Sequence, residues 1–179
     1  VNGTGAKFTL IHIERSIQFI QNHYAGKACF ADDMNNFSDI LQCTGLKTDI
    51  PNMKFTTEKI ALLGKMLGTA DLLGQMADRF YLEKLITLYD EFQEGCVPGF
   101  DSKIDLLRKT IGFYSWTKTR LENDFGNVAR FMADHFRERW HIEGNLYEET
   151  MDRNIDYLKS ILKSSQENTF KSLRRKTIT

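Results

Sequence analysis

Three polar residues on an otherwise apolar segment are the first candidates for chemistry. In LGTADLLGQMADRFYLEKL, residues 67–85, Asp71, Gln75 and Asp78 recur at i, i+4 and i+7. If the whole segment is one helix, these side chains lie within about 60° of one another around its axis. Leucine, methionine and alanine flank them, so the stripe can face a cleft, where a carboxylate needs a cation or a metal as partner. The alternative is a solvated helix face or a polar contact between helices.

Other polar residues are weaker candidates. Arg79 can clamp a phosphate with its planar guanidinium, or it can pair with Glu83 one turn further on. His12 can contact a metal or a substrate, or it can be a structural histidine. A basic group in HFRERW can form an anion-binding face, although a solvated charged face is the simpler interpretation; its members are His135, Arg137 and Arg139.

The segment around Asp71 resembles the final core helix of the HD-domain metal-dependent phosphohydrolases. Its residues ADL, at positions 70–72, match the last metal-binding aspartate of that family. Upstream, HIERS (residues 12–16) and ILQCTGL (residues 40–46) resemble segments of the same family. Downstream, EGCVPGFDSKIDLLRKTIGFY and HFRERW resemble the helical extension of one bacterial subgroup. The resemblance covers residues 3–162.

This resemblance implies that a metal-activated water cleaves a phosphomonoester or a phosphodiester. The substrate class includes nucleotides. A divalent metal polarises a phosphoryl oxygen and generates hydroxide near neutral pH. The sequence does not distinguish Mn, Fe, Zn, Ni and Mg as that metal. By resemblance, Asp71 is the metal ligand, Asp71, Gln75 and Asp78 are catalytic, and His12 and Arg79 bind the phosphorylated substrate.

The chain departs from the family at the His-Asp doublet, which supplies further metal ligands. No His-Asp dipeptide occurs, and the nearest pair is the reversed Asp134-His135. We therefore expect the chain to begin just after the doublet, with a missing N-terminal segment, and to be inactive alone. The alternative is a non-catalytic all-helical module for ligand binding or oligomerisation.

Loss of such a segment should leave apolar helix faces uncovered. Uncovered apolar patches larger than a few hundred Å² promote association. We therefore expect the chain to form a homodimer or to retain the missing segment as a partner. The residues expected to lack cover are Leu10, Ile13, Ile17, Leu72 and Met76.

The composition argues against several other classes of protein. Lysine plus arginine and aspartate plus glutamate number 24 each, and this neutral balance argues against a nucleic-acid binder. Cys29, Cys43 and Cys96 lack the spacing of a metal or redox motif, and three thiols do not make a disulfide framework. No apolar run approaches the roughly 20 residues that span a bilayer. We expect a cytoplasmic protein with no membrane partner.

A helical period in nearly every long segment predicts an all-α fold. Thr56 and Asp101 are expected N-caps, and Asn145 with Glu148 forms a pair like a capping box. The linker QEGCVPGF separates residues 1–93, an HD-type core remnant, from residues 94–179, a helical extension packed on it. The expected helices are 9–24, 30–43, 56–92, 101–124, 127–140 and 146–163.

Overall fold

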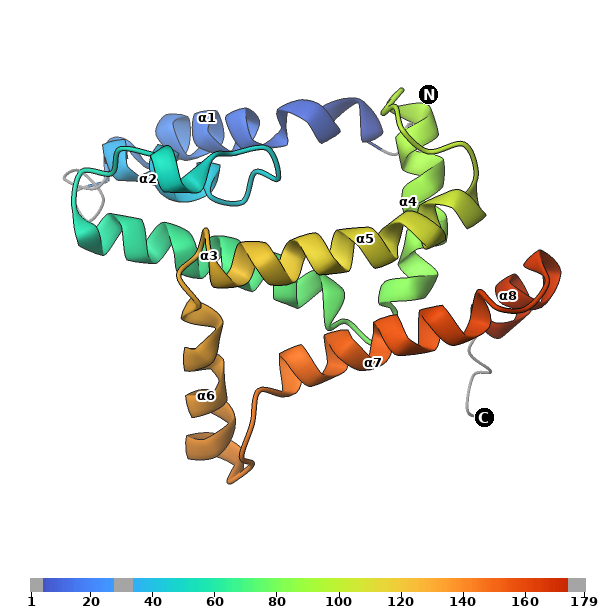
Figure 1. Cartoon of the computed structure of the whole chain (residues 1–179). Coiled ribbons are helices and arrows are strands. Elements are labelled where there is room, and N and C mark those ends of the chain that lie inside the picture. Colours follow the sequence, from blue (N-terminus) through green and yellow to red (C-terminus); the bar gives the residue numbers. More distant parts are fainter. Residues whose placement is uncertain (1–4, 28–33, 174–179) are drawn as a thin grey trace. The chain divides into compact units, whose positions relative to one another are not determined.

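The described part of the chain is built from helices joined by turns and loops, with no strand. The computed structural model describes residues 5–27 and 34–173, apart from the side chain of Asn35. Every element in these ranges is an α-helix or a short 3-10 helix, which confirms the all-α prediction (Figure 1). In chain order they are η1 (Ala6–Ile11), α1 (His12–Tyr24), α2 (Met34–Gln42), η3 (Ile50–Asn52), α3 (Glu58–Met76), α4 (Tyr81–Glu94), α5 (Lys103–Glu122), η4 (Val128–Arg130), α6 (Phe131–Trp140), α7 (Leu146–Ile161) and α8 (Gln166–Leu173).

The chain groups into two compact units, each built from segments that are distant in the sequence. The N-terminal unit comprises residues 8–72 and 118–144. The C-terminal unit comprises residues 1–7, 73–117 and 145–179. Helices α3 and α5 each pass from one unit into the other. The division near residue 93 that the linker suggested is not one of these boundaries, and it stays a prediction.

Capping side chains set the starts of three helices. Thr57, rather than the expected Thr56, accepts a hydrogen bond from the Ile60 amide at 3.2 Å and caps α3. Asn145 caps α7 as expected, because its side chain accepts from the Tyr147 amide at 3.2 Å. Such caps satisfy backbone N–H groups that have no partner within the helix. The third start, that of α5, also differs by one residue from the expectation.

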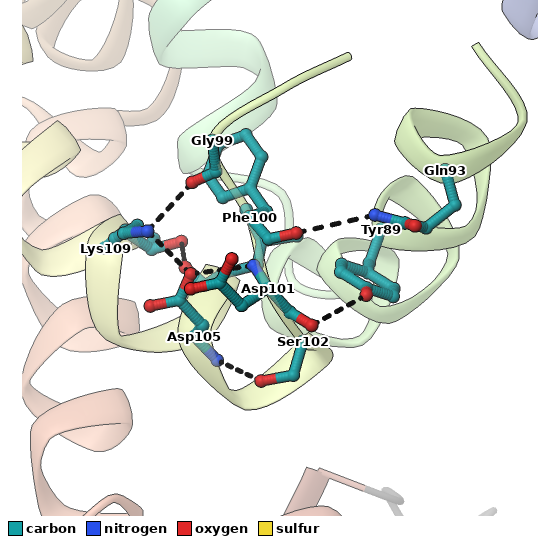
Figure 2. Close-up of polar contacts among 10 residues, drawn as sticks. Tyr89, Gln93, Gly99, Phe100, Asp101, Ser102, Asp105 and Lys109 are labelled. Carbon is teal, nitrogen blue, oxygen red and sulfur yellow. Dashed lines mark hydrogen bonds and ion pairs between the residues drawn. The ribbon is translucent and has the colours of Figure 1, made fainter. Parts of the chain in front are cut away.

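The linker before α5 is fastened to the helices on both sides of it (Figure 2). Ser102, rather than Asp101, caps α5 by accepting from the Asp105 amide at 3.2 Å, and the Asp105 carboxylate accepts from the Asp101 amide. The Lys109 ammonium donates to the Gly99 carbonyl at 2.8 Å and pairs with Asp105 at 2.6 Å. Lys109 thereby holds the pKa of Asp105 below its usual range. From α4, Tyr89 and Gln93 donate to the Asp101 and Phe100 carbonyls.

A buried arginine anchors the core of the N-terminal unit. Arg120 on α5 is 6% exposed. Its Nη2 atom donates to the carbonyls of Gly45 at 2.9 Å and Thr48 at 3.1 Å, and its Nη1 atom pairs with Asp124 at 3.1 Å. The guanidinium also lies over the Phe125 ring, 5.2 Å from its centroid. One charged side chain thus fixes the loop after α2 to the end of α5.

The two described cysteines differ in burial. Cys43 lies in this core with 1% exposure, and burial raises the pKa of its thiol to about 11. A thiol so rarely deprotonated is unreactive. Cys96 is an exposed free thiol, and Cys29 lies outside the described residues.

Only some of the apolar residues that were expected to lack cover are exposed in the structure. Helix α1 packs against α2, yet no residue of α1 is buried, and Leu10 before it is 69% exposed. Ile13 and Ile17 are half-buried. The expectation was wrong for Leu72 and Met76, which are 4% and 1% exposed, because both point into the core.

An asparagine from a distant helix closes the end of α3 in the C-terminal unit. Asn154 on α7 is buried, and its amide donates to the Met76 carbonyl at 2.9 Å and to the Asp78 carbonyl at 3.1 Å. Carbonyls at a helix end have no partner within the helix and need one elsewhere. In the same unit, α7 packs against α4 and α8.

Candidate functional site

The predicted polar stripe does not lie on one continuous helix. Asp71 and Gln75 are one turn apart on α3, but α3 ends at Met76. Asp78 therefore lies in the turn between α3 and α4, and the expectation of a helix running from residue 56 to about 92 was wrong. The position of Asp78 follows from its contacts in the turn, not from a helical period.

Asp78 uses both carboxylate oxygens to hold this turn. Oδ1 accepts from the Phe80 amide at 2.7 Å, and Oδ2 pairs with the Lys84 ammonium on α4. The Lys84 hydrogen bond and then the Phe80 amide hold the pKa of Asp78 below its usual range. Near the N-terminus of α4 a carboxylate is also favoured by the helix dipole. These contacts give Asp78 a structural role in the turn between α3 and α4.

A structural role for Asp78 predicts a pH-dependent loss of stability in its variants. Asp78→Ala should lower the free energy of unfolding by about 1 kcal/mol, the usual cost of a lost cap. A depressed folded-state pKa stabilises the fold above the usual carboxyl range, and that contribution disappears as pH falls through the folded-state value. Thermal unfolding should therefore be measured at pH 7 and below about pH 4. The difference in stability between wild type and Asp78→Ala should be smaller at the acidic pH. Equal stability of the two proteins at pH 7 would argue against this role.

Two of the predicted catalytic residues line one groove of the C-terminal unit. The groove lies between the end of α3 and α4, has a volume of about 440 Å³, and includes Gln75, Asp78 and Lys84. Its wall contains Tyr81, which is buried, and burial raises the pKa of this phenol well above its usual range. The predicted substrate residue Arg79 is exposed, and its guanidinium lies 4.3 Å from the centroid of the Phe80 ring.

Asp71, the predicted metal ligand, is half-buried on α3. It borders the buried pair Leu72 and Leu73, so its side chain lies at the edge of the core. Across the described residues no group of three or more His, Cys, Asp or Glu side chains could hold a metal ion. These residues alone therefore do not fit the metal centre that the HD-domain resemblance implies.

His12 lines a different groove, in the N-terminal unit between α1 and α2. This groove has a volume of about 720 Å³. Its lining residues on α1 are spaced so that they share one face of the helix, and Phe37 of α2 adds to the lining. His12 was among the residues predicted from the sequence and the neighbouring Arg15 was not, although both belong to one helical period. The α1 residues are His12, Arg15, Ser16, Phe19, Ile20 and Tyr24.

The basic group of α6 has the contacts of a solvated charged face. His135, Arg137 and Arg139 are all exposed. Arg137 pairs with Asp134 one turn earlier and with Glu138. Because nearby carboxylates partly neutralise this helix, it offers a phosphate a weaker site than an unpaired arginine would.

Residues 1–123 match the sequence profile of the family described as Npun_R2479-like. The chain belongs to the Npun_R2479-like family. The match ends just after α5, so α6, α7 and α8 lie outside it. The comparisons with curated proteins and with solved structures found no match. The description of the family names neither an HD domain nor an activity. None of the helices in the described ranges combines the length and apolar character needed to cross a bilayer.

Proposed function

We propose that the chain forms part of a metal-dependent phosphohydrolase to which Asp71 contributes one metal ligand. The observation that carries the proposal is the placement of Asp71 on α3, where it is a half-buried residue next to buried Leu72 and Leu73. The resemblance of residues 67–85 to the final core helix of HD-domain enzymes supplies the chemistry. The substrate class is a phosphomonoester or phosphodiester, nucleotides included, and the metal is Mn, Fe, Zn, Ni or Mg.

The described residues do not supply the three or more ligands that such a centre needs, so the chain by itself should be inactive. One carboxylate holds a divalent metal weakly, since metal sites in proteins use several ligands. His12 and Arg79 remain the proposed substrate contacts, and Gln75 and Asp78 the proposed catalytic partners of Asp71. The proposed location is the cytoplasm, a reducing compartment in which the free thiols Cys43 and Cys96 are stable.

Manganese titration tests whether Asp71 is a ligand. Electron paramagnetic resonance of free Mn²⁺ should show weak binding to the chain, with a dissociation constant of about 1 mM or higher. Asp71→Asn should weaken that binding further, whereas Glu122→Gln, which neutralises an exposed carboxylate on α5, should not. Identical titrations of wild type and Asp71→Asn would overturn the assignment of Asp71. Tight stoichiometric binding lost in Asp71→Asn would show that the chain holds the complete ligand set.

A second candidate function is a non-catalytic helical module for oligomerisation. The observation that favours it is an exposed apolar face on α3. Leu62, Leu63, Met66 and Leu67 are each 37–44% exposed and lie on one side of the helix. Exposed apolar groups of this kind tend to associate. A second copy of the chain, related by a two-fold axis, is the simplest partner.

This candidate predicts self-association at micromolar concentration. Light scattering should give a mass above that of a monomer, and Leu62→Glu with Met66→Glu should restore the monomer mass by placing charges on the apolar face. Asn123→Glu, on the exposed side of α5, serves as a control that adds charge elsewhere. A wild-type chain that stays monomeric and binds no hydrophobic dye would contradict the oligomerisation function.

A further inference from the structure

The groove between α1 and α2 changes character along its length. His12, Arg15 and Ser16 occupy the first turns of α1, and Phe19, Ile20 and Tyr24 follow on the same face. With a rise of 1.5 Å per residue, His12 and Phe19 are about 10 Å apart along the axis. One end of the groove is thus polar and cationic, while the rest is lined by aromatic and aliphatic side chains.

Arg15 is available to an anion. Its guanidinium lies over the Phe8 ring, 3.8 Å from the centroid. No carboxylate within the described ranges forms an ion pair with it. Stacking on an aromatic face holds a guanidinium in place and leaves its N–H groups for a ligand. Arginine without a carboxylate partner is the side chain best suited to bind a phosphate or carboxylate with two parallel hydrogen bonds.

His12 is held in one orientation beside Arg15. Its Nδ1 atom donates a hydrogen bond to the Thr9 carbonyl oxygen at 2.6 Å. The Nε2 atom is then the ring nitrogen left for other contacts; it accepts a hydrogen bond in the neutral imidazole and donates one to an anion only when the ring is protonated. Ser16 donates its hydroxyl proton to the His12 carbonyl at 2.8 Å. The polar end is therefore built from side chains that local hydrogen bonds and a ring contact already orient.

The apolar part of the groove is also ordered by ring contacts. The Phe19 ring stacks on the His23 ring at a centroid distance of 4.1 Å. It also makes an edge contact with the Tyr24 ring, at a centroid distance of 6.4 Å. Phe19 is nevertheless 54% exposed, so much of its surface can contact a ligand. Ligand sites in proteins combine such apolar walls with a few oriented polar groups, in volumes of roughly 300–1,000 Å³.

We infer that this groove binds a small organic anion with an aromatic or aliphatic body, its acidic group held by Arg15 beside His12 and its body by Phe19, Ile20, Tyr24 and Phe37. Charge complementarity determines the choice of ligand, because the polar end carries an arginine that no described carboxylate neutralises. A phosphate ester and a carboxylate share this chemistry. The inference needs no metal and no contribution from Asp71.

Calorimetric titration of the full chain with 1-naphthyl phosphate tests the inference. Binding should be saturable, and 1-naphthol, which lacks the anion, and inorganic phosphate, which lacks the body, should each bind about tenfold more weakly or worse. 1-Naphthoate provides the carboxylate arm. If 1-naphthyl phosphate binds more tightly than 1-naphthoate, the ligand is an organic phosphate. If the two bind equally, the ligand class is organic acids in general. Both outcomes support the groove as an anion site.

Two exposed residues allow the contacts to be removed without disturbing the core. Arg15→Gln should weaken 1-naphthyl phosphate binding about tenfold, and Phe19→Ala should weaken 1-naphthyl phosphate and 1-naphthol alike. Arg108→Gln removes an equal charge from an exposed position on α5 and should leave binding unchanged. Circular dichroism should show that all three variants fold. Naphthol binding as tight as that of the phosphate, or no effect of Arg15→Gln, would overturn the inference. Neither result would alter the manganese titration that tests Asp71.

Discussion

Replacing Gly68 with alanine should destabilise the N-terminal unit by roughly 2 kcal/mol or more, although alanine is the better helix former. Gly68 is buried in the interior of α3. A Cβ atom built there would lie 2.6 Å from the Cys43 carbonyl oxygen and 2.7 Å from Cζ of Phe125. Phe125 has no exposed surface, so neither the ring nor the backbone can move aside without disturbing the core. Urea unfolding followed by circular dichroism measures the loss.

Gly74 provides the matched control on the same helix. A Cβ atom at Gly74 would meet no heavy atom within 4 Å, and the residue is exposed. Gly74→Ala should therefore raise the free energy of unfolding by roughly 0.5–1 kcal/mol through helix propensity alone. The two glycines should thus respond with opposite signs. Stabilisation by both substitutions would mean that α3 does not approach Cys43 and Phe125 as closely as the structure shows.

Replacing Arg120 with methionine should cost about 3 kcal/mol of stability. The substitution keeps much of the side-chain volume but removes the donors to the Gly45 and Thr48 carbonyls and the partner of Asp124. Removing one member of a buried charge pair is usually expensive because its partners stay behind in the core. Asp124 is 28% exposed, so water can compensate part of that loss. Thermal and urea unfolding should both report the change.

Arg130 serves as the control for the arginine experiment. It also donates to two backbone carbonyls, those of Gly126 at 3.2 Å and Asn127 at 3.1 Å, but it is exposed. Water can replace these bonds, so Arg130→Met should change stability by about 0.5 kcal/mol or less. Similar losses in the two variants would show that Arg120 owes its effect to charge rather than to its buried contacts.

The sequence predicted the all-α class and most of the α-helices, but it merged α3 with α4, missed α8 and placed several helix ends wrongly. Local periodicity identifies an amphipathic segment, whereas the choice of a cap between two adjacent polar residues depends on the path of the chain before the helix. Thr57 rather than Thr56 caps α3, and Ser102 rather than Asp101 caps α5. Neighbouring residues of similar capping ability are not distinguished by composition alone.

The end of α3 could not be predicted from its own sequence. The residues that follow Met76, ADRFY, contain no glycine or proline that would end a helix. The carbonyls of Met76 and Asp78 instead accept hydrogen bonds from Asn154 on α7, a helix far along the chain. Asp78 then holds the turn before α4. This tertiary contact separates Asp78 from the helical stripe that includes Asp71 and Gln75.

Only one wall of the groove in the N-terminal unit could be recognised from the sequence. The α1 face from His12 to Tyr24 follows a helical period that can be recognised, and Arg15 belongs to it. The contribution of Phe37 depends on the packing of α2 against α1, which no local pattern specifies. The metal-ligand role of Asp71 was proposed from a resemblance, and no group of three or more possible ligands occurs among the described residues to support it.

The most direct test of the proposed phosphohydrolase function is to locate bound Mn²⁺ on the chain. Paramagnetic Mn²⁺ at substoichiometric concentration broadens the amide signals closest to it in ¹H–¹⁵N correlation spectra. If Asp71 is a metal ligand, the signals of residues 69–73 should broaden first, and Asp71→Asn should remove that effect. Broadening that is strongest at another acidic group, such as Asp134 and Glu138 of α6, with residues 69–73 unaffected, would contradict the proposal.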